Sequence, residues 1–235
     1  METLTINGRI IGPEEPPYII AEIGSNHNGD MELAKKMIDA AIDAEADAVK
    51  FQSWSKASLI SKAEYERNTE YADKHRHFGT LAEMCEAYQF TPEQHREVAS
   101  YCTDKGITFL STPFSMPETD LLEQLGVPLF KVASMDVNNV PLLNHIGSKG
   151  RPVILSTGMS TLGEVERAVE ALRGAGSGPI CLLHCIAIYP PKYEDINLRN
   201  LKTLRTLFDL PVGFSDHSIG TAIPLAAVAL GGMRY

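Results

Sequence analysis

The sequence lacks the features that mark secreted and membrane proteins. Its four cysteines form no CxxC pair. Residues 1–10 lack the charged start and apolar run of a secretory signal. The longest apolar stretch, Ala222–Leu230, is shorter than the roughly 20 residues that cross a bilayer. These absences predict reduced thiols in a cytoplasmic protein without a membrane partner.

The chain also has little positive charge. It has 21 Lys and Arg and 30 Asp and Glu, which gives a formal net charge of −9. An acidic surface repels phosphate backbones, so nucleic acid is excluded as an expected partner. Small anions remain possible ligands, because a local group of lysines and helix N-termini can reverse the field inside a cleft.

What the sequence does contain is a repeated alternation of short apolar runs and amphipathic segments. Strands buried on both faces of a parallel sheet have this character. The runs are Tyr18–Ile23, Ala48–Phe51, Ile107–Leu110, Leu129–Ala133, Val153–Leu155, Ile180–Leu183 and Val212–Phe214.

Helix signals lie between these runs. Met31–Glu45 has apolar residues at helical spacing, and Asp30 precedes it as an N-cap. Thr91 precedes a proline in the manner of a second helix start. Thr161 and Glu164 have the spacing of a capping box. Strand–helix alternation of this kind predicts an α/β fold.

Polar residues follow nearly every predicted strand, and this favours a closed barrel over an open, doubly wound sheet. An open sheet usually binds its ligand at one switch point, whereas a barrel brings all strand ends to one mouth. We therefore expect a TIM-type (β/α) barrel of about seven strand–helix units. The polar positions are Glu22, Lys50–Gln52, Ser111–Thr112, Ser134–Asp136, Ser156–Thr157, His184 and Ser215–His217.

Two segments depart from a plain barrel. Thr5–Ile11 contains Asn7–Gly8 between apolar residues, which predicts an N-terminal β-hairpin with a type I′ turn. Ser53–Phe90 is a long insertion after the second predicted strand. Such a loop often forms a wall or lid of an active site.

Two lysines, Lys50 and Lys131, lie at predicted strand ends and could receive a phosphate or a carboxylate. An ion pair with an acidic side chain is the alternative for each. Glu22 could transfer a proton or orient water, or it could simply neutralise Lys50. Hydroxyl groups would complete the anion site, at Ser111, Thr112, Ser134, Ser156, Thr157 and Ser215.

His184 and His217 are the candidate metal ligands, because an imidazole at a strand end can bind a divalent transition ion. A hydrogen-bonded core histidine is the alternative. Cys185 could be a soft ligand or an inert buried thiol.

The strand-end segments together resemble the sialic acid synthase family, which includes the N-acetylneuraminate, legionaminate and pseudaminate synthases. The resemblance is collinear from about Tyr18 to Gly232. It is carried by Ala21–Gly29, Val49–Gln52, Ser111–Phe114, Lys131–Ser134, Leu155–Met159, Leu183–Cys185 with Tyr189–Pro190, and Gly213–His217.

This resemblance implies a (β/α)₈ barrel followed by a small antifreeze-like domain. It implies a carbon–carbon bond-forming transferase of sialic acid biosynthesis. The reaction condenses phosphoenolpyruvate with an N-acylated amino-sugar aldehyde, such as N-acetylmannosamine, to a nonulosonic acid and phosphate. A divalent metal, manganese, and a homodimer are also implied.

Site roles carry over by position. Glu22 and Asp136 would be catalytic, and His217 would be one metal ligand. The implied substrate-binding residues are Lys50, Gln52, Thr112, Lys131, Ser134, Ser156, Tyr189 and Ser215.

The chain departs from the family pattern at three places. Asp136 stands where many members have Glu, and Ala187 where they have Ser or Asn. The chain ends at Gly231–Tyr235, where the family enters its eighth strand and supplies a second metal-binding His. We therefore interpret residues 1–235 as one barrel domain, incomplete at its C-terminus, with a hairpin over 1–17 and no antifreeze-like domain. A truncated synthase of this kind is expected to have weak or no activity.

Other functions fit parts of the pattern. A related barrel, such as a deoxy-octulosonate phosphate synthase, would use the same phosphoenolpyruvate chemistry on a phosphorylated sugar. A Schiff-base aldolase would use Lys131 as its nucleophile. A remnant without catalysis would only bind or misfold.

Overall fold

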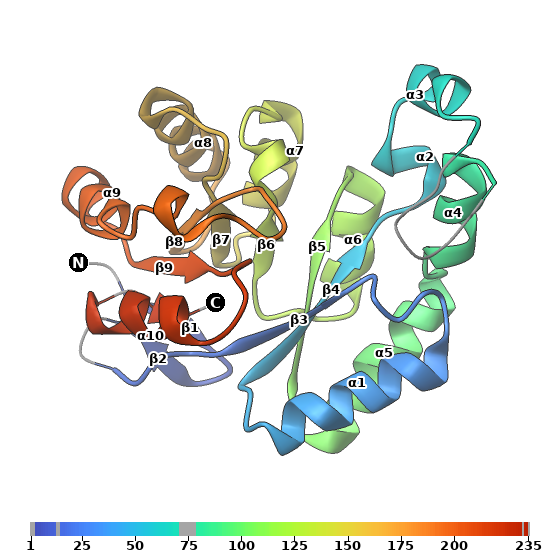
Figure 1. The fold of residues 1–235 in the computed structure, drawn as a ribbon, viewed down its shortest axis with the longest axis horizontal. Helices are drawn as coiled ribbons and strands as arrows, with labels where there is room; N and C mark the ends of the chain where they lie inside the picture. Colours follow the sequence, from blue (N-terminus) through green and yellow to red (C-terminus); the bar gives the residue numbers. More distant parts are fainter. Residues whose placement is uncertain (1–2, 13–14, 71–78, 232, 235) are drawn as a thin grey trace. The chain divides into compact units, whose positions relative to one another are not determined.

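The computed structural model describes residues 3–12, 15–70, 79–231 and 233–234. The chain divides into two compact units, one formed by residues 22–125 and the other by residues 1–21 with 126–235. Strands alternate with helices along the chain (Figure 1). Each predicted apolar run overlaps a strand, so the α/β prediction is confirmed.

The unit of residues 22–125 is built on a three-stranded sheet of order β3–β4–β5. The strands are β3 (Ile20–Gly24), β4 (Ala48–Ser53) and β5 (Thr108–Pro113). β4 and β5 are parallel, with Phe51 opposite Ser111 and Gln52 opposite Thr112. The carboxyl ends of these two strands therefore lie next to each other.

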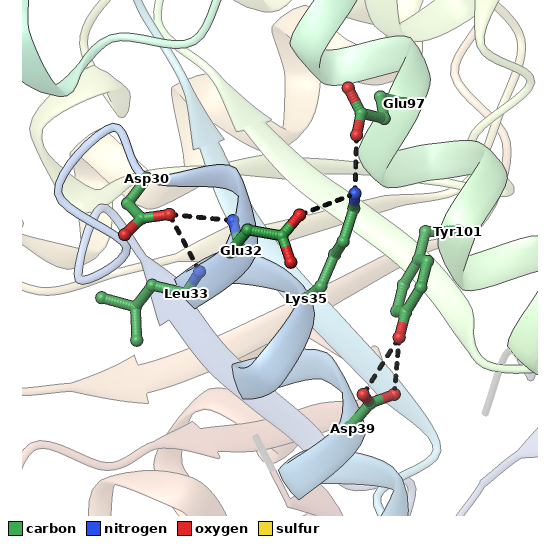
Figure 2. A network of polar contacts seen from close by, with 7 residues as sticks. All are labelled: Asp30, Glu32, Leu33, Lys35, Asp39, Glu97 and Tyr101. Carbon is green, nitrogen blue, oxygen red and sulfur yellow. Dashed lines mark hydrogen bonds and ion pairs between the residues drawn. The ribbon is translucent and has the colours of Figure 1, made fainter.

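Three longer helices belong to this unit: α1 (Met31–Asp43), α5 (Pro92–Lys105) and α6 (Met116–Gln124). The Asp30 side chain accepts hydrogen bonds from the first turn of α1, as predicted (Figure 2). The side chains of Thr91 and Gln94 form a capping box at the start of α5. The helix starts predicted at Asp30 and Thr91 are thus confirmed.

Polar contacts tie α1 to α5 (Figure 2). Lys35 Nζ lies 2.8 Å from Glu97 Oε1, and the Tyr101 hydroxyl donates to both Asp39 carboxylate oxygens at 3.0 Å. Lys105 pairs with the same Asp39. Hydrogen bonds from Lys105 and Tyr101 lower the pKa of this carboxyl. The two helices are therefore held side by side on their solvent edge.

The described residues of the insertion between Ser53 and Phe90 form three short helices. They are α2 (Lys56–Leu59), α3 (Lys62–Arg67) and α4 (Leu81–Tyr88). Trp54, Leu81 and Cys85 form a small buried cluster beneath them. Residues 71–78 of the insertion lie outside the described residues. Its role as a wall or lid stays a prediction.

The unit of residues 1–21 and 126–235 contains a parallel sheet of order β10–β9–β8–β7–β6. Two of its inner strands, those at 153–156 and 180–185, are buried at every position, which fits their mostly apolar sequence. The strands are β6 (Phe130–Val132), β7 (Val153–Ser156), β8 (Ile180–Cys185), β9 (Val212–Ser215) and β10 (Met233–Arg234). The two-residue β10 continues the parallel order after the seventh strand–helix unit.

Helices follow these strands in turn. They are α7 (Val140–Gly147), α8 (Leu162–Gly174), α9 (Asn200–Phe208) and α10 (Ala222–Ala229), with short 3₁₀ turns η1 (Ser134–Asp136) and η2 (Tyr193–Asp195). The capping box predicted for Thr161 and Glu164 begins α8. Across the described ranges, no helix is long and apolar enough to cross a membrane.

The N-terminal hairpin is also confirmed. β1 (Leu4–Ile6) pairs with β2 (Arg9–Ile11) in antiparallel fashion. Asn7 and Gly8 connect them with φ angles of 48° and 84°. Positive φ at both central residues defines the type I′ turn that an Asn–Gly pair favours.

Candidate active site

Within residues 22–125, Lys50 and its neighbours form the first group of predicted site residues. Lys50 is only 7% exposed, and its ammonium forms an ion pair with Glu22 of β3. The same ammonium donates to Thr112 Oγ1 at 3.4 Å, and this hydrogen bond links β4 to β5. The ion pair considered for Glu22 is therefore present. Because the Glu22 side chain is 46% exposed, its carboxylate can still reach a ligand or water.

Gly24 brings Gln52 into this group. Gly24 has a φ of +57°, and a Cβ placed on it would lie 3.2 Å from Glu22 Oε1 and 3.4 Å from Gln52 Nε2. The two side-chain ends thus meet over a backbone that carries no side chain of its own. A residue other than glycine would crowd both and would also be strained at this φ.

A buried hydrogen-bond chain lies on the opposite face of the same strand ends. Because strand residues alternate between faces, Ser53 and Ser111 point away from Gln52 and Thr112. Ser53 Oγ lies 2.7 Å from Ser111 Oγ and 2.8 Å from His95 Nε2, and His95 Nδ1 lies 3.0 Å from the Thr91 carbonyl.

The donor and acceptor of each hydrogen bond in this series follow from the Thr91 carbonyl at its end. A carbonyl can only accept, so His95 donates from Nδ1 to Thr91. Burial lowers the pKa of His95, which favours the neutral ring, and Nε2 then accepts from the Ser53 hydroxyl. Ser53 in turn accepts from Ser111. The first turn of α5 is thereby connected to both strand ends.

His27 supports the loop that follows β3. Its ring stacks on Phe90 with centroids 3.8 Å apart, and Nδ1 accepts from the Gly29 amide at 3.0 Å. Burial, with a smaller contribution from His95, lowers the pKa of His27 to about 4. His27 therefore shapes the turn that follows β3.

In the other unit, Lys131 and Ser156 form the centre of the second group. Lys131 is 4% exposed, and its ammonium donates to Ser156 Oγ at 2.6 Å and to the Val132 carbonyl at 2.7 Å. A hydroxyl and a carbonyl are both acceptors, as an ammonium requires. The Lys131 ammonium is therefore held between these two acceptors, within β6.

Ser134 lies beyond Lys131 at the start of η1. Its Oγ accepts from the Gly158 amide at 3.0 Å and lies 3.1 Å from Cys185 Sγ. Cys185 ends β8 and is 5% exposed. Segments after three different strands thus converge on one hydroxyl.

Asp136 is buried two residues further on. Asn139 donates to its Oδ1 at 3.2 Å, whereas Oδ2 is buried with no hydrogen-bond partner. Burial raises the pKa of this carboxyl, and the nearby Lys131 partly opposes the shift. A buried carboxyl oxygen of this kind favours a ligand that donates a hydrogen bond to it.

His217, Ser215 and Tyr189 form the far end of this group. His217 donates from Nδ1 to the Ile186 carbonyl at 2.7 Å, and its ring stacks on Tyr189 with centroids 4.0 Å apart. Nε2 is then the acceptor nitrogen, and the Ser215 hydroxyl can donate to it at 3.5 Å. Metal-binding histidines are usually oriented by a hydrogen bond such as the one from Nδ1 to Ile186.

His217 therefore fits a role as one ligand of a divalent metal. Within the described residues, no three His, Cys, Asp or Glu side chains are grouped as a complete metal site. His184, the other candidate, donates from Nε2 to the Ile196 carbonyl at 2.6 Å and packs near Phe214. His184 therefore has the geometry of a hydrogen-bonded core histidine, which was the alternative to a metal ligand.

The structure thus gathers the predicted residues into two groups, each at the carboxyl ends of its own parallel strands. That both groups border one pocket stays a prediction. Sequence reasoning missed Ser53, His95 and Gly158. Strand alternation could have placed Ser53 and Ser111 on the face opposite Gln52 and Thr112, but no sequence signal pairs them with His95 of α5.

Comparison with known proteins gives curated relatives that include several synthases. An N,N′-diacetyllegionaminic acid synthase from Campylobacter jejuni is 42% identical over 219 residues, which are 91% of this chain and 64% of that protein. The human N-acetylneuraminate-9-phosphate synthase is 38% identical over 225 residues, 95% of this chain and 62% of its own length. The chain spans less than two thirds of the length of these two curated relatives.

Solved structures confirm the fold class. The N-acetylneuraminic acid synthetase from Leptospira borgpetersenii, solved with citrate, superposes with a TM-score of 0.88 at 35% identity, over 99% of this chain and 76% of that one. A truncated 3-deoxy-D-arabino-heptulosonate 7-phosphate synthase from Thermotoga maritima shares the fold at 14% identity, with a TM-score of 0.72 over 99% of this chain and 78% of that one. Residues 37–234 match the NeuB family. The chain therefore belongs to the NeuB family.

Proposed function

We propose that this chain carries the phosphoenolpyruvate-binding part of a synthase that makes a nonulosonic acid from an N-acylated amino-sugar aldehyde. The observation that carries the proposal is a pair of buried lysines, Lys50 and Lys131, each hydrogen-bonded to a hydroxyl at a neighbouring strand end. The synthase names of the relatives support the reaction class.

Phosphoenolpyruvate carries a phosphate and a carboxylate, and each needs a cation and hydroxyl donors. Lys131 with Ser156 would hold one of these anionic groups, and Ser134 would donate a further hydrogen bond. Lys50, Gln52 and Thr112 would hold the other. A buried ammonium binds an anion more strongly than an exposed one because the surrounding dielectric is low.

In the proposed reaction, the enol carbon of phosphoenolpyruvate attacks the aldehyde carbon of the sugar and forms the new carbon–carbon bond. Water then adds to the resulting oxocarbenium carbon, and the tetrahedral intermediate releases phosphate. Glu22 would accept the proton of that water, which its exposed carboxylate can reach. The two lysines would stabilise the negative charges of the phosphate and of the carboxylate throughout.

A divalent metal, manganese in our proposal, would polarise the aldehyde oxygen when bound. His217 would supply one ligand through Nε2, the nitrogen that the Ile186 hydrogen bond leaves available. Tyr189, stacked on this imidazole, would contact the sugar. Asp136 would accept a hydrogen bond from a sugar hydroxyl at Oδ2, the oxygen that has no hydrogen-bond partner.

Calorimetric titration of the chain with phosphoenolpyruvate tests the binding step. We expect saturable binding to the unsubstituted chain and at least a tenfold loss with Lys131→Met. Lys202→Met is the matched control, because Lys202 is exposed on α9. Equal binding by both variants would refute the assignment of Lys131.

Phosphate release tests the reaction. The assay contains phosphoenolpyruvate, manganese and a panel of N-acylated hexosamines, with and without a phosphate on the sugar. Release that requires one class of sugar supports the proposal and identifies the acceptor. The same assay tests the expectation of weak turnover by this chain. Trapping of pyruvate on Lys131 by borohydride would instead favour a Schiff-base aldolase.

A further inference from the structure

The Ser134 hydroxyl is enclosed by two other groups. Gly158 donates its amide hydrogen to Ser134 Oγ at 3.0 Å, and Cys185 Sγ lies 3.1 Å from the same oxygen. These three residues follow or end strands β6, β7 and β8. The cluster therefore joins three strand ends through one oxygen atom.

The hydrogen-bonding capacity of a hydroxyl limits what this arrangement can do. An oxygen of this kind has two lone pairs and one proton. The Gly158 amide occupies one lone pair. If the Cys185 thiol donates to the second, the Ser134 proton is left for another acceptor. If Ser134 donates to sulfur instead, it has no proton to offer to a ligand.

The position of Gly158 is fixed independently. The Thr157 amide and hydroxyl both donate to the Leu183 carbonyl of β8, at 2.9 Å each. A Cβ on Gly158 would lie 2.8 Å from Cys185 Sγ and 2.9 Å from Ser134 Oγ. Both distances are shorter than a normal contact, so only glycine lets the three groups approach this closely.

We propose that Cys185 is a positioning residue whose thiol donates to Ser134 and so directs the Ser134 hydroxyl proton toward the anionic group of phosphoenolpyruvate. This inference rests on the proposed function and adds to it a role for a residue outside the binding set. Cys185 contacts Ser134 rather than the ligand. It acts as neither nucleophile nor metal ligand in this role.

A comparison of two substitutions tests the thiol as a donor. Cys185→Ala removes the donor, and we expect phosphoenolpyruvate affinity to fall about 5- to 10-fold, in line with one lost hydrogen bond. Cys185→Ser keeps a donor at the same position and should restore most of the affinity. Cys181→Ala is the matched control, because Cys181 is buried on the same strand and its thiol faces the Leu182 carbonyl.

A double-mutant cycle separates positioning from general damage. In a Ser134→Ala background the hydroxyl is absent, so Cys185→Ala should cause little further loss of affinity. Where turnover is measurable, KM for phosphoenolpyruvate should rise with Cys185→Ala while kcat changes little. If Cys185→Ala does not unfold cooperatively, Cys185→Val replaces it, since valine fills the site without a donor.

The outcomes are distinguishable. Equal affinities of the Ala and Ser variants, or an undiminished effect of Cys185→Ala in the Ser134→Ala background, would overturn this inference and leave the proposed function standing. Failure of the unsubstituted chain to bind phosphoenolpyruvate would overturn both.

Discussion

Lys50 and Lys131 are both more than nine-tenths buried, and their partners differ. Lys50 is neutralised by the Glu22 carboxylate. Lys131 donates to a hydroxyl and a carbonyl, with the Asp136 carboxyl near enough for each charge to influence the other. A buried ammonium gains from an incoming anion, because the anion compensates a charge that has been removed from water. This gain applies to both lysines.

The Ser53–His95 hydrogen bond should matter for stability even though neither residue was predicted from the sequence. Ser53→Ala leaves His95 Nε2 buried without a partner, which should cost about 1–3 kcal/mol of unfolding free energy. Urea unfolding measures it. Ser100→Ala, at an exposed position of the same helix as His95, should change stability by less than about 0.5 kcal/mol. A Ser53→Ala chain as stable as this control would contradict the hydrogen-bond chain.

Stability should also depend on pH through His27. Its pKa is 6.5 in the unfolded reference and about 4 in the fold, so between these values the unfolded chain binds the proton and the folded chain does not. The contribution of His27, on the order of 3 kcal/mol, is present above pH 6.5 and is lost as pH falls toward 4.

Urea unfolding between pH 4 and 7 measures this slope. His27 faces Phe51, Phe90 and His95, whose pKa is lowered as well. His27→Asn should therefore reduce the slope without removing it. An unchanged slope would show that His27 is not the group that titrates.

At the scale of helices and strands, the sequence predicts an element well where the deciding residues lie within a few positions of each other. Thr161, Asn7–Gly8 and the apolar runs each predicted an element that the structure contains. These signals succeed because a cap, a turn or a buried strand is decided by neighbouring residues.

Contacts between distant segments were not predictable in the same way. Strand alternation predicts that Ser53 and Gln52 face opposite sides, but nothing in the sequence indicates that α5 places His95 against Ser53. The choice between ligand and core histidine for His184 likewise depended on the Ile196 carbonyl, twelve residues away. Which face of an element meets which neighbour is decided by tertiary packing.

The capping box of α8 gives a prediction at this scale. The Thr161 side chain accepts from the Glu164 amide, and the Glu164 carboxylate accepts from the Thr161 amide. Thr161→Ala removes the cap and should cost about 1 kcal/mol, whereas Thr161→Ser should be close to neutral. Thermal or urea unfolding of the three chains gives the comparison. Equal losses for Ala and Ser would argue against a capping role.

At the scale of the whole molecule, the chain has two compact units, and each contains its own parallel sheet and its own group of predicted site residues. Neither group alone supplies both lysines. Ligand binding to either group should therefore stabilise the unit that carries it, because only the folded state of that unit presents the binding residues.

The distribution of cysteine along the chain makes this testable. All four thiols are free and buried, with Cys85 and Cys102 in one unit and Cys181 and Cys185 in the other. A coloured disulfide reagent should therefore react slowly with the native protein, and each reaction should report the opening of one unit. Variants that retain a single cysteine would then report the opening rate of the unit that carries it. The native sequence therefore already contains a buried reporter of unfolding in each unit.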